Sequence, residues 1–529
     1  MITMTSQDPS TTGPSLIALL DRALARHPDR SAFAWDGGSL SYRGANELIG
    51  RMQAVFADGG LVRGSRVALL AANQVEAWCA GMAASASGMV TTWLHQLGSL
   101  DDHLFQLRDF GAEALVLDAT GFASRSADLV TQHAAGFAGF KQVYTLAPSE
   151  LGVDLTAAAE HIGHHSLRDL SRASDLAVIN YTGGTTGRSK GAMRTQAGYA
   201  AMITSIVTDF ELPERPHYLA AAPMTHVAGT LVQPTLMRGG TVRLMRGFAP
   251  DRLLELIARE RINCTLLVPT MIYTLLDHSA LDRTDLSSLH SLIYGASPMS
   301  PTRLVEGLER IGPVFAQLYG QTEGYPISFL NRADHDARTP ELFSSCGVAN
   351  SISTVVLLGE DDQPVAPGEV GELCVRGPQL MQGYLNQPEL TAATLKGGWL
   401  HTGDMARADD RGYLFIVDRK KDMIVSGGFN VYPRDVEDVI SSHPAVAMVA
   451  VIGVPDAKWG EAVTAMVQLR PGASVTADEL VALVRQRKGA VQAPKHVEFV
   501  TDLPRTAVGK IDKKVLRQPF WAGRGRQVG

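Results

Sequence analysis

The chain has 529 residues, which is too long for a single hydrophobic core and predicts two or more domains. Hydrophobic residues make up 45% of the chain and charged residues 19%, a balance typical of a globular enzyme. The formal net charge of −6 gives no general attraction to nucleic acid or to an anionic membrane, so neither is expected as a partner.

The cysteines and the first residues indicate the compartment. Four cysteines, at positions 79, 264, 346 and 374, are scattered without a C-x-x-C pair. This pattern predicts reduced thiols in a cytoplasmic protein and argues against a disulfide framework or a zinc site. Residues 1–14 lack the basic and apolar pattern of a secretory signal. The uncharged stretch 77–100 is diluted by Ser, Thr and Gly and is predicted as a buried helix and strand, with no membrane span.

The predicted elements follow an α/β pattern. Residues 15–27 form an amphipathic helix, with leucines at helical spacing. Beyond residue 42, helical patterns alternate with short apolar strands at 67–70, 90–93, 114–117, 143–146, 176–179, 242–245 and 266–268. Such alternation predicts stacked α/β layers built on largely parallel sheet.

The second half of the chain changes character. Strands at 355–358, 371–375 and 413–417, separated by Pro/Gly turns, predict a small antiparallel β subdomain. A helix at 433–440, strands at 445–454 and 462–469, a turn at Pro455-Asp456 and a capping box at Thr476 predict a compact α+β domain. We therefore expect a large α/β N-terminal domain over 1–420 and a small α+β C-terminal domain over 421–529.

The strongest chemical signal is the stretch 181–191, Tyr-Thr-Gly-Gly-Thr-Thr-Gly-Arg-Ser-Lys-Gly. Glycine lets backbone N–H groups turn toward an anion, hydroxyls can donate to phosphate oxygens, and Arg188 and Lys190 supply positive charge. The stretch predicts a polyphosphate-binding loop; the alternative is a flexible surface hairpin. Its spacing fits neither the Walker A loop nor the Rossmann fingerprint.

This stretch resembles the signature of the adenylate-forming superfamily, which contains acyl-CoA synthetases, peptide-synthetase adenylation domains and beetle luciferases. Matching segments recur along the chain, so that the resemblance covers Ser15 to about Arg517. They are 223–226, 292–298, 317–323, 398–404, 418–433 and 503–512.

The resemblance implies a role for each segment. The phosphates of ATP would be held by Thr182, Gly183, Gly184, Thr185, Thr186, Gly187 and Lys190. The adenine and acyl sites would be bordered by Gly295, Ala296, Ser297, Tyr319, Gly320 and Gln321. Tyr319 can stack on adenine, Thr322 can donate to the α-phosphate, and the Glu323 carboxylate can hold Mg²⁺. Standing alone, that last motif would read as a capped helix start.

Further roles carried over are Asp404 and Arg419 on the ribose and His226 at the acyl pocket. A lone His is more often a core residue, and Lys510 would normally be a surface charge; the resemblance makes Lys510 the catalytic lysine. Lys421 matches the hinge of a mobile C-terminal domain, whose Gly427 and Gly428 would leave room for pantetheine. Thr225 replaces the usual aromatic residue, which suggests a wider pocket entrance.

The combined prediction is an AMP-forming acyl-CoA ligase acting on an apolar-to-mixed carboxylic acid, with ATP, Mg²⁺ and coenzyme A. Thr322, Glu323, His226 and Lys510 are its expected catalytic residues. Alternatives are transfer of the acyl group to a carrier protein, an enzyme of the thioester-forming half-reaction only, and a silent nucleotide binder. The identity of the acid and the oligomeric state, including a homodimer, stay open.

Overall fold

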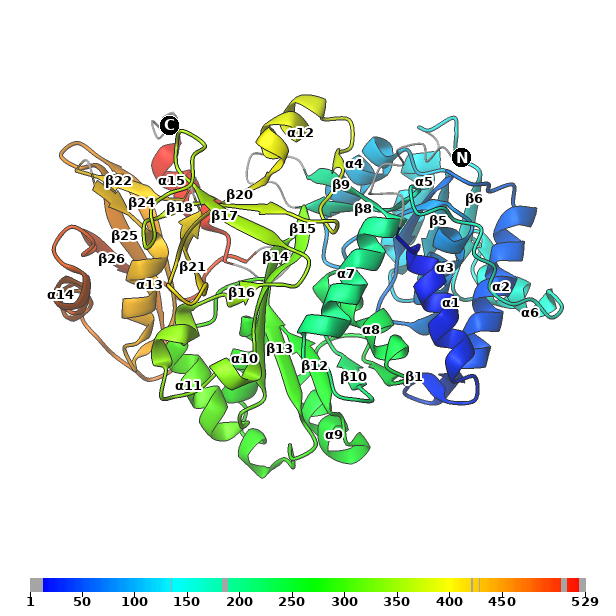
Figure 1. Ribbon diagram of the computed structural model, residues 1–529, viewed down its shortest axis with the longest axis horizontal. Coiled ribbons are helices and arrows are strands. Elements are labelled where there is room, and N and C mark those ends of the chain that lie inside the picture. The colour runs from blue at the N-terminus through cyan, green and yellow to red at the C-terminus, as the bar shows by residue number, and fades with distance from the viewer. Residues whose placement is uncertain are drawn as a thin grey trace, which may run out of the picture.

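The computed structural model describes residues 13–134, 136–182, 189–419, 422–427, 429–505 and 511–522. In these ranges the strands form four sheets, of which three lie before residue 420 and one after it (Figure 1). None of the described helices combines the length and the apolar character needed to cross a bilayer.

One large sheet has eight strands in the order β19-β9-β8-β4-β3-β5-β6-β7. Its central strands are parallel, whereas β9 runs antiparallel to both β8 and β19. The strands are β3 (Arg66–Leu70), β4 (Val90–Trp93), β5 (Ala114–Leu117), β6 (Gln142–Thr145), β7 (Val153–Asp154), β8 (Leu176–Thr182), β9 (Lys190–Thr195) and β19 (Gly383–Tyr384).

The other large sheet has nine strands in the order β16-β15-β14-β13-β12-β10-β11-β1-β2, with a parallel centre and antiparallel edges. Its strands are β1 (Ser31–Trp35), β2 (Gly38–Ser41), β10 (His217–Ala220), β11 (Thr241–Leu244), β12 (Cys264–Leu267), β13 (Ser291–Gly295), β14 (Phe315–Gln321), β15 (Gly324–Leu330) and β16 (Val348–Ala349).

Helices between the two sheets bury the main core, and others cover the outer faces, which gives five stacked layers (Figure 1). The inner helices are α1 (Leu16–Arg26), α2 (Tyr42–Asp58), α3 (Val75–Ala86), α7 (Gln196–Asp209) and α8 (Val232–Met237). The outer helices are α4 (Leu100–Phe110) and α5 (Ala123–Ala134) on the eight-stranded sheet, with α9 (Pro250–Glu260), α10 (Pro269–Leu276) and α11 (Pro301–Arg310) on the nine-stranded one. The short α6 (Leu155–His161) packs on α2.

The predicted antiparallel subdomain is a four-stranded sheet with the order β17-β18-β20-β21. Its strands are β17 (Thr354–Leu358), β18 (Gly371–Arg376), β20 (Leu400–Ala408) and β21 (Leu414–Arg419), with α12 (Pro388–Thr394) beside them.

The C-terminal sheet follows at once and has its own core. It comprises β22 (Ile424–Ser426), β23 (Phe429–Val431), β24 (Val446–Asp456), β25 (Gly460–Leu469) and β26 (His496–Phe499), packed by α13 (Pro433–Ser441), α14 (Ala477–Lys488) and α15 (Lys513–Trp521).

The predicted α/β layers, the antiparallel subdomain and the α+β domain are confirmed, and most predicted strands match within two residues. The expected turn at Pro455-Asp456 is wrong: both residues extend β24, because they pair with Glu461 and Gly460 of β25. Asp404 lies inside β20, and the positive φ of 71° falls on Gly403 before it.

Candidate active site

Three loops that follow parallel strands meet at one edge of the nine-stranded sheet. They are residues 223–230 after β10, residues 296–300 after β13, and the turn Thr322–Glu323 after β14. Ligands of open α/β sheets bind at this carboxyl edge. Among the predicted site residues, His226, Ala296, Ser297, Thr322 and Glu323 lie in these loops, whereas Thr182, Lys190, Asp404 and Arg419 belong to other sheets.

Three residues from separate strands meet at one carboxylate. The Tyr319 hydroxyl donates to Asp404 Oδ2 at 2.6 Å, and Arg419 Nε lies 2.9 Å from Asp404 Oδ1. Asp404 and Arg419 are also directly opposite each other in the pairing of β20 with β21. We call Tyr319, Asp404 and Arg419 the ribose corner.

Burial and charge affect the pKa values of Arg419 and Tyr319. The Asp404 side chain is 4% exposed whereas that of Arg419 is 44% exposed, so the guanidinium is open on one side. The nearby Asp404 carboxylate raises the pKa of Arg419, and burial raises the pKa of Tyr319 well above its usual value. A carboxylate has about four acceptor positions, and side chains of the described residues use two of them here. The remaining capacity suits a pair of hydroxyl groups.

The Thr322–Glu323 turn is held from two sides. Arg194 Nη2 donates to the Thr322 carbonyl at 2.7 Å, and the Tyr384 hydroxyl donates to Glu323 Oε1 at 2.6 Å. The backbone N–H of Met381 donates to the Glu323 carbonyl at 2.8 Å. The turn thus presents a carboxylate and a threonine hydroxyl on a fixed backbone.

The two ends of the glycine-rich stretch are described, and its middle is not. Thr182 ends β8 and pairs with Lys190, the first residue of β9, so an antiparallel pair carries the stretch. Lys190 Nζ lies 5.4 Å from the centre of the Tyr384 ring, within cation–π range. The predicted residues Gly183, Gly184, Thr185, Thr186 and Gly187 lie outside the described residues.

The turn after β13 contains a position that only glycine can occupy, followed by a residue with a strained backbone. A Cβ on Gly295 would lie 2.4 Å from the Leu318 carbonyl oxygen, so the close pairing with β14 requires glycine. Ala296 has a φ of 65°, a left-handed conformation that costs an L-residue roughly 1–2 kcal/mol. Such strain concentrates at functional sites. Ser297 continues this turn, and Gly320 lies beside Tyr325, whose ring a Cβ would meet at 2.9 Å.

His226 belongs to a pair of imidazoles. The centre of its ring lies 4.3 Å from that of His95 with the planes tilted by 32°, and its Nδ1–H donates to the Thr225 carbonyl at 2.8 Å. Burial, together with the neighbouring His226 and His103, lowers the pKa of His95 to about 4. The backbone N–H of Leu97 donates to His95 Nδ1 at 3.0 Å, which leaves the proton of the neutral ring on Nε2.

The C-terminal residues of the prediction are described in part. Gly427 has a φ of 60°, and a Cβ there would lie 2.9 Å from the Trp459 ring, so the position requires glycine. Lys421, Gly428 and Lys510 lie outside the described residues. Gln321 ends β14.

Two family models match the chain. The model described as AMP-binding enzyme matches residues 20–385, and the model described as AMP-binding enzyme C-terminal domain matches residues 435–510. The chain belongs to the AMP-binding enzymes. Their acyl-CoA ligase branch is the one predicted from the motifs.

Relatives of this AMP-binding enzyme span nearly its whole length. It is 43% identical to the medium/long-chain-fatty-acid–CoA ligase FadD8 of Mycobacterium tuberculosis, covering 97% of this chain and 91% of that protein. It is 36% identical to a feruloyl-CoA synthase of an Amycolatopsis species, covering 93% and 96%. These findings confirm the predicted enzyme class, an AMP-forming carboxylate–CoA ligase.

Solved structures agree on the fold. The amide bond synthetase McbA from Marinactinospora thermotolerans matches with a TM-score of 0.88 and 33% identity, over 96% of this chain and 100% of that one. ATP-bound MatB from Rhodopseudomonas palustris matches with a TM-score of 0.87 and 30% identity, over 96% and 99%.

Sequence reasoning missed three residues at the site of this AMP-binding enzyme: Arg194, Tyr384 and His95. Arg194 carried a signal, because it follows the small and apolar residues Gly191, Ala192 and Met193 in a strand that has no exposed position. Tyr384 and His95 carried none, since nothing in their local sequence predicts a partner more than 60 residues away.

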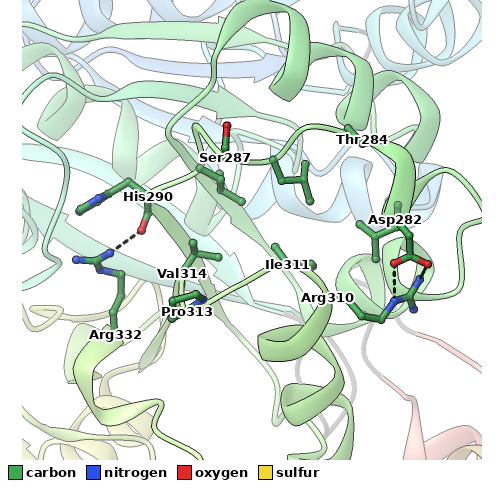
Figure 2. A pocket seen from close by; sticks show the side chains of 12 residues that line it. Asp282, Thr284, Ser287, His290, Arg310, Ile311, Pro313, Val314 and Arg332 are labelled. Atoms are coloured by element: carbon green, nitrogen blue, oxygen red, sulfur yellow. Dashed lines mark hydrogen bonds and ion pairs between the residues drawn. The ribbon is translucent and has the colours of Figure 1, made fainter.

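A cavity of about 470 Å³ lies elsewhere and contains none of the predicted site residues (Figure 2). It is at the amino ends of β13 and β14, the sheet edge opposite the motifs. Its arginines have partners: Arg310 pairs with Asp282 at 2.9 Å, and Arg332 Nη1 donates to the His290 carbonyl at 3.0 Å. The AMP-binding site is assigned from the motifs and their geometry.

Proposed function

We propose that this enzyme activates a medium- or long-chain, largely apolar carboxylic acid in two steps. A carboxylate oxygen attacks the α-phosphorus of ATP, the bond from that phosphorus to the oxygen bridging to the β-phosphate breaks, and pyrophosphate leaves. The sulfur of coenzyme A then attacks the acyl carbon of the acyl adenylate. The bond to AMP breaks, AMP leaves, and the thiol proton is released to solvent.

The ribose corner is the observation that carries this proposal. Three residues that are 15 to 100 positions apart meet at Asp404, and each lies in a separate motif named from the sequence. An ion pair with spare acceptor capacity and a half-open guanidinium suits the two ribose hydroxyls of a nucleotide. Holding the nucleotide in this way supplies rate through positioning.

The remaining adenylation roles are assigned by the resemblance together with placement. Thr182, Lys190 and the glycine-rich stretch between them bind the β- and γ-phosphates, Tyr319 stacks on adenine, and Thr322 donates to the α-phosphate. Gly295, Ala296, Ser297, Gly320 and Gln321 border the adenine and acyl sites. Lys510 bridges the carboxylate and the nucleotide and lowers their repulsion.

Mg²⁺ fits the residues present. Glu323 offers a carboxylate on a fixed turn, and Mg²⁺ in nucleotide enzymes takes one or two carboxylates along with phosphate oxygens. Bound there, the ion neutralises charge on the phosphates. The chain's own contribution is to hold that carboxylate, with the backbone of the turn fixed by Arg194 and Met381.

The second step is assigned to a different arrangement of the C-terminal domain. Lys421 is the hinge, and rotation there replaces Lys510 with Gly427 and Gly428, whose missing side chains admit pantetheine. The boundary between the domains is placed at 420/421. The change of sheet between Arg419 and Ile424 supports it.

Substrate and location are proposed from relatives and local chemistry. The relatives named as ligases of fatty acids and of ferulate favour CoA as acceptor and an apolar or aryl acid as donor. Thr225 and His226 border the acyl group, where the small Thr225 side chain widens the entrance. Free, buried cysteines support a cytoplasmic enzyme.

The test measures AMP release from ATP over a panel of fatty and aryl acids, with and without CoA, and identifies products by mass spectrometry. CoA-dependent AMP with the matching acyl-CoA supports the proposal. Acyl adenylate that is passed to an added amine instead would favour amide synthesis, the activity named for the McbA structure. Thioester formed only from preformed acyl adenylate would make the enzyme one of the second half-reaction alone.

A further inference from the structure

A short segment joins the two large sheets beside the proposed phosphate site. Residues 380–386, which we call the strap, run along the edge of β9. Gly383 and Tyr384 pair with Met193 and Ala192, and Leu385 N–H donates to the Gly191 carbonyl at 2.8 Å. The strap therefore continues the eight-stranded sheet at the strand that begins with Lys190.

The other side of the strap is bonded to the nine-stranded sheet. Met381 N–H donates to the Glu323 carbonyl at 2.8 Å, and Leu380 forms a β-bridge with Gly324. The strap thus contacts the strand that ends the glycine-rich stretch and the turn that carries the carboxylate.

The far end of the strap is tied to the first strand of the glycine-rich stretch. Asn386 Nδ2 donates to Asp109 Oδ1 at 3.1 Å, and the Tyr181 hydroxyl donates to Asp109 Oδ2 at 2.7 Å. Both strands that flank the stretch are therefore connected to the strap.

Tyr384 is the only strap side chain among the described contacts that reaches both charged groups of the site. Its hydroxyl donates to Glu323 Oε1 at 2.6 Å, and its ring lies 5.4 Å from Lys190 Nζ. Tyr384 is 6% exposed, and a phenol that faces a carboxylate acts as the donor. A short hydrogen bond to a carboxylate is of the stronger, charge-assisted kind.

We propose that Tyr384 is a positioning residue that fixes the Glu323 carboxylate relative to Lys190. Glu323 would then offer a bound Mg²⁺ a carboxylate whose orientation relative to Lys190 is fixed. This inference rests on the proposed function, since it concerns the same nucleotide site. Groups that orient a metal ligand in this way change metal affinity or activity by about 10- to 100-fold when removed.

The test is Tyr384→Phe, which removes the hydroxyl and keeps the ring for Lys190 and for packing. Binding of ATP is measured by titration calorimetry at a series of Mg²⁺ concentrations without acid or CoA. We expect the Mg²⁺ concentration for half-maximal enhancement of ATP binding to rise about 10-fold or more. ATP binding without Mg²⁺, and thioester formation from preformed acyl adenylate, should be unchanged.

Tyr144→Phe is the matched control. Tyr144 is a buried tyrosine of β6, and its hydroxyl has no hydrogen-bond partner among the described residues. This variant should bind Mg²⁺ and ATP as the unmodified enzyme does.

Two results would overturn the role of Tyr384. One is an unchanged Mg²⁺ dependence in Tyr384→Phe. The other is an equal loss in Mg²⁺-free binding, Mg²⁺-dependent binding and thioester formation, which marks a merely structural side chain. Failure of the proposed function is separate: the unmodified enzyme would bind Mg²⁺ and ATP yet form no acyl adenylate with any acid.

Discussion

Strand β21 carries two acidic or basic side chains at its end that serve opposite regions of the molecule. Arg419 faces Asp404 on the neighbouring strand β20, within one sheet. Asp418, one residue earlier, faces the C-terminal domain, where its Oδ2 accepts from the backbone N–H of Arg434 at 3.2 Å. Side chains alternate along a strand, so adjacent residues point to opposite faces.

The difference separates a fixed contact from a movable one. The Asp404–Arg419 pair lies within one sheet and is set by strand register, so the proposed rotation of the C-terminal domain would leave it intact. The Asp418 contact joins residues on either side of the proposed hinge at Lys421, so the proposed rotation would break it. Asp418 also faces a cluster of charges in the residues beyond the hinge: Lys513, Glu437 and Asp422. One strand end thus carries both the pair proposed to hold the ribose and a contact to the C-terminal domain.

Asp404→Asn should break the Asp404–Arg419 pair and have the largest effect on the rate of adenylation. The amide keeps the shape but removes the charge that pairs with Arg419 and accepts from Tyr319. Loss of one preorganised charged contact at a reacting nucleotide costs about 10²- to 10³-fold in rate. Acyl adenylate formation, followed as pyrophosphate release, should fall by that factor.

Asp409→Asn is the control for that measurement. Asp409 lies in the turn after β20, where it pairs with Arg411 at the surface. It should retain adenylation within about twofold, since exposed pairs contribute little. Full adenylation in Asp404→Asn would show that the corner does not hold the nucleotide.

Arg194→Met tests the role of a buried guanidinium that holds the Thr322 carbonyl without a partner of opposite charge among the described residues. Arg194 is 5% exposed, and among the described residues no carboxylate lies within ion-pair distance. Burial lowers its pKa. Replacing a buried charge by an apolar side chain of similar size is often neutral or stabilising. We expect an unchanged or higher melting temperature, together with adenylation reduced about 10-fold because the Thr322 carbonyl loses its donor.

Arg303→Met gives the opposite pattern and serves as control. Arg303 is also buried, yet it pairs with Asp277 and Glu306 at 2.8 and 2.7 Å. Its removal takes away two short ion pairs, although Glu306 keeps Arg310 at 3.0 Å, so the melting temperature should fall while adenylation by the folded enzyme is kept. If both variants lost stability alike, the buried guanidinium of Arg194 would be structural.

The sequence predicted the parts of the site that reside in local motifs. The glycine-rich stretch, Asp404 and Glu323 each lie in a short segment whose residue types indicate a chemical role. The sequence could not predict the contacts between them, because these depend on pairings of distant strands. Tyr384 reaches Glu323 only since β19 pairs with β9, and Arg194 lies under Thr322 because β9 is buried beside the turn. The turn expected at Pro455-Asp456 failed for the same reason, as cross-strand pairing overrode local turn propensity.

The contact of Asp418 with the C-terminal domain should depend on pH. Burial raises the pKa of Asp418 from 3.8 to about 6; Glu437 and Asp422 also raise it, while Lys513 opposes them. A carboxyl whose pKa is raised in one arrangement stabilises that arrangement when it is protonated. This stabilisation of the arrangement is lost as pH rises through the window from 3.8 to 6. The described arrangement should gain population as pH falls below 6.

The ratio of the two half-reaction rates between pH 5 and 7 measures this effect. Asp418→Asn mimics the protonated carboxyl, so it should shift the ratio severalfold at pH 7 and remove its change below pH 6. Asp410→Asn, in the exposed turn between β20 and β21, should keep the unmodified profile. An Asp418→Asn enzyme with the unmodified profile would remove Asp418 from the movable contact.

Arg470→Gln should have the smallest effect, because it removes a peripheral contact of the same moving domain. Arg470 lies 3.9 Å from Asp277 of the N-terminal domain, and their side chains are 36% and 63% exposed. Asp277 already holds Arg303 at 2.8 Å, so it keeps a partner. An exposed pair at this distance contributes about 0–1 kcal/mol, which limits the change in the half-reaction ratio to roughly fivefold. Salt screens such a pair, so the difference from the unmodified enzyme should vanish in 1 M salt, where the screening length is about 3 Å. A larger change in the half-reaction ratio that persists in high salt would make Arg470 the main contact between the domains and Asp418 a lesser one.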